Sequence, residues 1–127
     1  MLIAGVFFLT SCVTVIQGSS PGTSVRPSVP GELRIAYLDV GQGDSIFIIL
    51  PNGETVLIDA GEKGRGKDII RHIKDNGKDT LDYIIVTHPH ADHMGGMAEI
   101  IEAFKINNIY MPKASNTTVA FERCLTR

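Results

Sequence analysis

Residues 88–96, HPHADHMGG, carry three of the chain's four histidines and one carboxylate. Imidazole and carboxylate are ligands that zinc and similar divalent ions bind in proteins, and several of them must converge on one ion. The proline between His88 and His90 favours an extended backbone, so these side chains can project from one side and share an ion. Asp92 and His93 are adjacent, so in an irregular loop they would point differently, which suits a second ion ~3.5–4 Å away. The segment therefore predicts a metal site.

Two other interpretations of this segment compete with a catalytic metal site. The histidines could lie on an ordinary surface loop, but so dense a pattern rarely arises by chance. A structural zinc site usually closes four ligands around one ion and relies on cysteine, and neither Cys12 nor Cys124 is near the segment in the sequence. The glycine pair that ends the segment, Gly95 and Gly96, would let the backbone pass close to the site before a helix begins.

The composition limits the class of protein without choosing a function. The 127 residues leave room for one domain, and 43% hydrophobic residues are typical of a globular chain with a modest core. The net charge of −2 gives no general argument for a nucleic-acid or membrane partner. Two cysteines do not make a disulfide framework. Any case for a partner must therefore come from local features.

The N-terminal segment indicates export. Residues 1–12 form an uncharged apolar run, too short for the ~20 residues of a membrane-spanning helix and typical of the core of a signal peptide. The residues that end at Cys12 resemble the bacterial lipobox, in which the cysteine carries diacylglycerol. No lysine or arginine precedes the run, so a buried or fraying N-terminus is the alternative. Residues 13–31, rich in Gly, Ser, Thr and Pro, are predicted to be a flexible linker to a domain over 32–127. We thus expect an extracytoplasmic, membrane-anchored bacterial lipoprotein.

The first part of that domain has the pattern of a β-meander. Runs rich in branched and aromatic residues predict strands over 33–40, 45–50 and 54–58. Turn signals at 41–44 and 51–53 separate them. We therefore expect three successive antiparallel strands.

The second part of the domain alternates helices and strands. Three isoleucines on one face predict a helix over 67–76, and His72, off that face, is expected to be a solvated surface residue. The nearly continuous apolar run 81–86 predicts a strand covered on both faces. The metal segment would then follow the end of a buried strand, where catalytic loops of layered α/β folds lie. The remaining predicted elements are a helix over 97–104, a strand over 109–111 and a helix over 117–125.

Three sequence stretches together resemble the metallo-β-lactamase superfamily. The metal segment follows a buried strand, and the sequence LIDAG at 57–61 precedes both. The stretch 38–45, LDVGQGDS, is similar to the branch that contains the C-terminal domain of the competence protein ComEC, although Ala60 stands where that branch usually has glycine. The resemblance, from about Leu33 to the end, implies an α/β fold of the αββα sandwich type with metals at one edge. The family completes its site with later ligands and no histidine follows His93, so the expectation is the N-terminal half of such a domain.

The resemblance also assigns roles to individual residues. His88 and His90 would hold a first metal ion, and Asp92 and His93 a second one. Asp59 would orient the ligating imidazoles from the outer shell by hydrogen bonding. The implied cofactors are two divalent ions, zinc or alternatively manganese. Asp92 would be the catalytic residue, because it would both hold a metal and orient the attacking water.

These features make a metal-dependent hydrolase the leading hypothesis, because two divalent cations activate water and polarise the attacked oxygen. The alternatives are a non-catalytic metal-binding module and an inactive fragment, and the missing later ligands predict that these 127 residues alone do not turn over substrate. The competence branch favours phosphodiesters, DNA included, over other small hydrolysable substrates. The basic stretch from Lys63 to Lys78 could contact phosphates, although a solvated loop and helix face is the favoured explanation of it.

Overall fold

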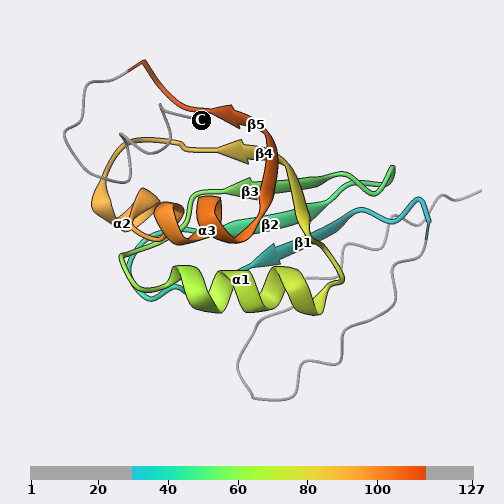
Figure 1. The fold of residues 1–127 in the computed structure, drawn as a ribbon, viewed down its shortest axis with the longest axis horizontal. Helices are drawn as coiled ribbons and strands as arrows, with labels where there is room; N and C mark the ends of the chain where they lie inside the picture. The colour runs from blue at the N-terminus through green and yellow to red at the C-terminus, as the bar shows by residue number, and fades with distance from the viewer. Residues whose placement is uncertain (1–29, 114–127) are drawn as a thin grey trace, which may run out of the picture.

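The computed structural model describes residues 30–113. The predicted lipid-bearing Cys12, most of the predicted linker and the predicted helix over 117–125 lie outside the described residues. Within residues 30–113, five strands form one sheet in chain order, and helices connect the later ones (Figure 1). The strands are β1 (Arg34–Tyr37), β2 (Ile46–Ile49), β3 (Thr55–Ile58), β4 (Thr80–Ile85) and β5 (Lys105–Tyr110), and the helices are α1 (Gly66–Asp75), α2 (Ala91–Met94) and α3 (Met97–Ala103).

The sheet is mixed, and its connections explain why. β1, β2 and β3 pair antiparallel through short turns, which confirms the three-stranded meander. β3, β4 and β5 run parallel, because α1 carries the chain from β3 to β4, and α2 with α3 carries it from β4 to β5. Parallel strands place their carboxyl ends at the same edge of the sheet. The segments that follow β3 and β4 therefore lie side by side.

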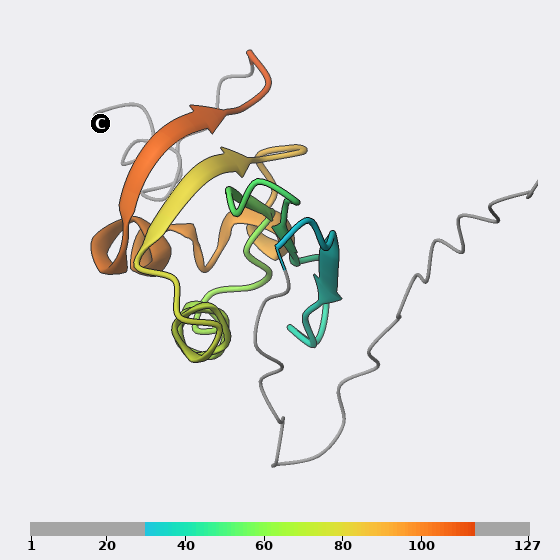
Figure 2. The ribbon, with the colours of Figure 1, turned by 90° about the vertical axis from the view of Figure 1, so that its right-hand side faces the viewer.

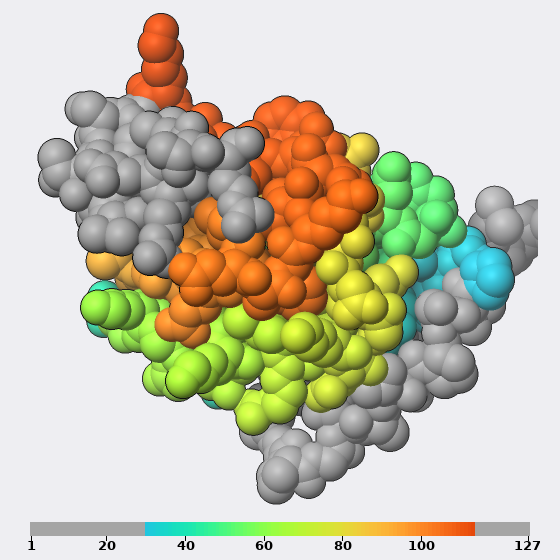
Figure 3. Space-filling model, in the orientation of Figure 1, coloured from blue at the N-terminus to red at the C-terminus, as the bar shows by residue number. Residues whose placement is uncertain are grey.

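Helices α1 and α3 cover the same face of the sheet (Figure 2). The predicted isoleucine face of α1 is confirmed, because Ile69 and Ile73 are buried in the core beside Phe47 and Leu57 of the sheet. Complete burial of an isoleucine side chain stabilises the fold by about 1.5–3 kcal/mol. The two helices also contact each other, and their surfaces meet in the space-filling view (Figure 3). Among the described residues, no helix is both long and apolar enough to span a bilayer.

His72 of α1 differs from its expected role as a solvated residue. Its side chain is half-buried, and its ring meets the Phe47 ring edge-on with 6.0 Å between centroids. Burial lowers the pKa of His72, the nearby Asp75 carboxylate opposes this effect, and the Arg34 guanidinium adds to it. The prediction was wrong because the Phe47 ring of β2 packs against His72, a contact that the spacing of the isoleucines does not indicate.

The opposite face of the sheet is only partly covered among residues 30–113. Strand β4 was expected to be covered on both faces, but Tyr83 and Ile85 remain partly exposed, whereas Ile84 is fully buried under the helices. Tyr83 stacks on Tyr110 of β5 with 6.4 Å between ring centroids. In an αββα sandwich a second sheet packs on such an apolar face. The described residues thus form one helical layer and one sheet of that architecture.

Candidate metal centre

The ends of β3 and β4 bring the predicted site residues together. Asp59 directly follows β3, and its backbone N–H donates to the Ile85 carbonyl at the end of β4, 2.9 Å away. The metal segment begins three residues after Ile85. Because β3 and β4 are parallel neighbours, the buried Asp59 lies directly beside the metal segment. Asp59 and His93, which are 34 positions apart in the sequence, therefore meet at one edge of the sheet.

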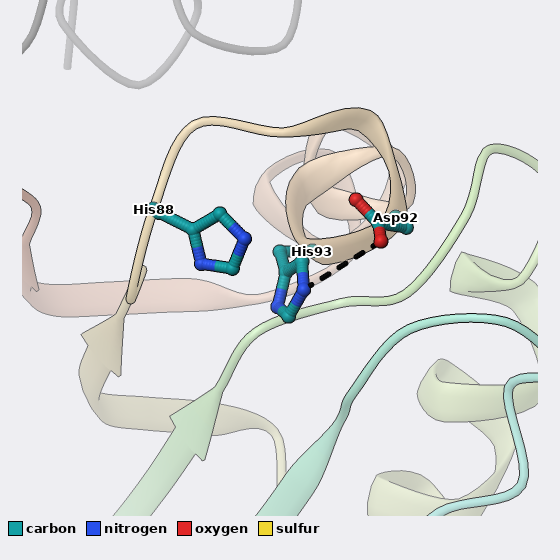
Figure 4. A group of neighbouring side chains, drawn as sticks. All are labelled: His88, Asp92 and His93. Atoms are coloured by element: carbon teal, nitrogen blue, oxygen red, sulfur yellow. Dashed lines mark ion pairs between the residues drawn. The ribbon is translucent and has the colours of Figure 1, made fainter.

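Three of the four predicted ligands converge in the structure. His88, Asp92 and His93 each offer a ligand atom, and these atoms all lie within 4.8 Å of one another. The rings of His88 and His93 have centroids 3.7 Å apart, and the Asp92 carboxylate lies 3.7 Å from Nε2 of His93 (Figure 4). Two imidazole nitrogens and one carboxylate oxygen form a donor set that suits zinc and similar divalent ions. This group fits a metal ion.

His90 lies next to this group but is not one of its three members. Its side chain is exposed, and its ring meets the His88 ring edge-on with 4.7 Å between centroids. The backbone is extended at His90 and then turns into α2, so the expected irregular loop is in fact one helical turn. The His90 carbonyl accepts from the backbone N–H groups of His93 and Met94. Adjacent helical residues are rotated by about 100° from each other, but the Asp92 carboxylate and Nε2 of His93 still come within 3.7 Å, so both side chains face the same space.

Asp59 is a buried acceptor for three groups of the metal segment. Its side chain is 2% exposed, and it accepts from the Thr87 backbone N–H at 2.8 Å and from the Thr87 hydroxyl at 2.5 Å. It also lies 2.9 Å from Nδ1 of His93. An ionised carboxylate only accepts, so Nδ1 of His93 carries the proton and Nε2 is free to bind a metal. Asp59 thus has the orienting position that the resemblance implied.

Thr87 extends this arrangement to the other histidine, and sequence reasoning missed it. Its single hydroxyl proton is donated to Asp59, so the oxygen accepts from Nδ1 of His88, which lies 3.0 Å away. Nε2 of His88 is then free for a metal as well. The signal in the sequence was the position of Thr87 between the buried strand and the first histidine. Asp44 was also missed, and its exposed carboxylate lies 3.9 Å from Nδ1 of His93.

Glycines let the neighbouring loops contact the metal segment backbone to backbone. A Cβ atom at Gly43, where φ is +102°, would overlap the carbonyl of Asp92. A Cβ atom at Gly95 would overlap the backbone of Lys63. The Ala60 N–H donates to the His93 carbonyl at 2.6 Å, and this bond ties α2 to the end of β3. The turn after β1 therefore packs against the ligand Asp92 because it is built of glycine.

The fold and the site together define an α/β protein with a candidate metal site, a histidine and aspartate cluster where two parallel strands end. Residues 38–124 match the family model described as the metallo-beta-lactamase superfamily. The chain belongs to this superfamily. This confirms the resemblance and the fold class predicted from the metal segment and the LIDAG strand.

Three curated relatives show where the chain is similar to known proteins. ComE operon protein 3 of Bacillus subtilis is 29% identical over 106 residues, and Recombination protein 2 of Haemophilus influenzae is 32% identical over 88 residues. Hydroxyacylglutathione hydrolase 2 of Vibrio vulnificus is 38% identical over 53 residues. The matches cover 70%, 65% and 42% of this chain, respectively, but only 14%, 11% and 21% of the relatives. The chain therefore spans a minor part of each relative, and the two longer matches confirm the likeness to the ComEC branch.

Proposed function

We propose that the protein is a metal-dependent hydrolase that cleaves phosphodiesters. The observation that carries this proposal is the convergence of His88, Asp92 and His93, with the buried Asp59 behind them. A bound divalent ion supplies Lewis acidity and activates water for attack. We propose two such ions, zinc or manganese, with His90 as the fourth ligand because its ring adjoins that of His88.

The chain's own residues would perform three tasks in this reaction. His88 and His93 present Nε2, because hydrogen bonds to Thr87 and Asp59 hold the proton on Nδ1. The Asp92 side chain is 33% exposed, so water and substrate can reach it. Asp92 would accept a hydrogen bond from the attacking water and orient that water toward the substrate. The buried Asp59 would hold the metal ligands in position while substrate binds and product leaves.

The choice of phosphodiesters rests on the competence branch. The LDVGQGDS stretch carries the resemblance to that branch, and the turn in this stretch contacts Asp92. A second candidate is the cleavage of a glutathione thioester. It is favoured by the 38% identity to a hydroxyacylglutathione hydrolase, which is higher than the identity to the other two relatives. A metal-binding module without turnover is the non-catalytic alternative.

One set of assays separates these functions. The metal-loaded protein is given bis-p-nitrophenyl phosphate, a hydroxyacylglutathione thioester and a chromogenic cephalosporin, and its metal content is measured. The double variant His88→Ala with His90→Ala tests the site, and His72→Ala is the matched control outside it. In a form of the protein that also carries the family's later ligands, we expect fastest cleavage of the phosphodiester, and loss of both metal and turnover only in the double variant. Residues 1–127 alone should turn over none of the three substrates. Faster thioester or cephalosporin cleavage would overturn the substrate assignment, and metal binding without turnover on any substrate would leave the non-catalytic module.

A further inference from the structure

The basic stretch after β3 divides into two groups in the structure. Three of its members have partners of their own. Arg71 pairs with Asp68, Lys74 lies over the Phe104 ring, and Lys78 donates to the Gly53 carbonyl. The positive charges of these three side chains are therefore used in contacts within the protein. This agrees with the interpretation of the stretch as a solvated loop and helix face.

The other three members, Lys63, Arg65 and Lys67, behave differently. All three side chains are exposed, and none forms a hydrogen bond or ion pair with another residue in the described range 30–113. They lie within five consecutive positions, in the loop before α1 and its first turn. We name these three residues the basic loop. Its charges are therefore available to a ligand.

Arg65 of the basic loop is seated next to the metal centre. Its guanidinium lies against Gly41, where a Cβ atom would be 2.9 Å from Nη2 and where φ is +73°. Two residues further along the same turn, Gly43 contacts the backbone of Asp92. Two residues of backbone span at most about 7 Å. The guanidinium is thus separated from a metal ligand by one short glycine turn.

The basic loop is also held in place from its other side. The Lys63 backbone packs on Gly95, which follows α2 directly. A Cβ atom at Gly96 would come within 3.0 Å of the Gly66 nitrogen. The loop is therefore fixed between the glycine turn and the glycine pair, and its position relative to the metal segment does not depend on flexible side chains.

We propose that Arg65, flanked by Lys63 and Lys67, binds the phosphate next to the scissile one in a single nucleic-acid strand. This inference rests on the proposed phosphodiesterase function and narrows its substrate class to polynucleotides. A guanidinium presents two parallel donors that match the oxygens of a phosphate. The turn that separates it from Asp92 is at most about 7 Å long, so a phosphate bound at Arg65 would lie close to a phosphate at the metal centre. A substrate with one phosphate would not reach both places.

Binding to a fluorescein-labelled single-stranded oligonucleotide, measured by fluorescence anisotropy in the presence of EDTA, tests this inference without turnover. The variants are Arg65→Ala, Arg65→Lys and Gly41→Ala, because a methyl group at Gly41 would displace the guanidinium. Arg71→Ala is the matched control, since Arg71 is an exposed arginine that pairs with Asp68. Circular dichroism confirms that each variant is folded.

We expect Arg65→Ala to weaken oligonucleotide binding about tenfold, as the loss of one charge-assisted contact does. Gly41→Ala should approach that loss, Arg65→Lys should lose less, and Arg71→Ala should stay within about twofold of the wild type. The slope of log affinity against log salt should flatten by about 0.7 in Arg65→Ala, the value of one phosphate contact on a single strand.

Two outcomes would overturn the assignment of Arg65. Unchanged binding by Arg65→Ala would show that Arg65 does not contact the strand. An equal loss of oligonucleotide affinity in Arg71→Ala would show diffuse electrostatic attraction instead of a binding site. Hydrolysis of bis-p-nitrophenyl phosphate by the wild-type protein is measured separately. A form of the protein that carries the family's later ligands and binds the strand through Arg65, but cleaves neither bis-p-nitrophenyl phosphate nor the oligonucleotide, would refute the proposed function and leave the binding site in place.

Discussion

Replacing Asp59 by asparagine should disable the metal centre without unfolding the protein. Asp59 has φ of +56°, a left-handed conformation that asparagine adopts as readily as aspartate, so the backbone is not strained by this change. The new side chain has one acceptor oxygen and one donor NH2 group. Its oxygen can still accept from the Thr87 N–H, but the NH2 group then faces His93. His93 must move its proton to Nε2, the atom that a metal would need.

The expected losses of unfolding free energy and of metal affinity follow from the changed hydrogen bonds of Asp59. A hydrogen bond to a charged group contributes about 1.5–3 kcal/mol, and Asp59→Asn removes the charge from the bonds to His93 and to the Thr87 hydroxyl. The metal-free variant should therefore lose about 1.5–3 kcal/mol of unfolding free energy. Loss of an outer-shell partner of a ligating histidine typically lowers metal affinity 10–100-fold. We expect both effects in Asp59→Asn.

Zinc affinity by chelator competition and urea unfolding of the metal-free protein give the two quantities. The matched control is Asp82→Asn, because Asp82 also accepts three hydrogen bonds, from the backbone and hydroxyl of Thr55 and from Asn107, but far from the site. Asp82→Asn should lower stability and leave zinc affinity unchanged. Zinc affinity in Asp59→Asn within about twofold of the wild type would refute the orienting role of Asp59.

Three further outcomes are expected. Gly43→Ala should lower metal affinity, because its methyl group would displace the Asp92 backbone, and a Gly53→Ala control, which meets no neighbour, should not; equal metal titrations would contradict this. The lowered pKa of His72 means that the unfolded state binds a proton more readily, so stability should fall as pH drops below about 6.5, and His72→Gln should lose less between pH 7.5 and 5.5 in urea melts. Equal losses would show that His72 does not carry this dependence. Cys12 should carry diacylglycerol, and mass spectrometry that finds it unmodified on an intact N-terminus would exclude the lipid anchor.

The sequence predicted those parts of the fold that depend on local pattern. The meander followed from apolar runs and turn residues, and α1 followed from isoleucines at helical spacing. It did not predict α2, because a four-residue turn carries too little periodicity to be read. It misplaced His72, because the Phe47 ring that covers it lies 25 positions away in the sequence. Long-range contacts of this kind have no local signal.

The sequence predicted the residues that would bind a metal, but it predicted the residues around these ligands less well. Spacing alone singled out His88, Asp92 and His93, because the ligands are clustered in the sequence. The hydroxyl of Thr87 could not be read from spacing, because its role depends on Asp59 from a neighbouring strand. The division of the basic residues into partnered and unpartnered groups also required the structure. Lys74 and Lys78 contact partners that are distant in the sequence, whereas the pair of Arg71 with Asp68 is local to α1.

The main-chain bonds around the site have a consequence for how the protein would take up metal. The amides of Ala60, Gly61 and Gly96 donate to carbonyls of His93, Asp44 and Gly61, so three separate loops are joined by backbone rather than by ligands. Their amide protons should exchange with solvent water as slowly in metal-free protein as those of β3, and chelation should hardly accelerate them. The metal would then bind to ligands on loops that are already ordered, and no metal-binding free energy would be used to order those loops.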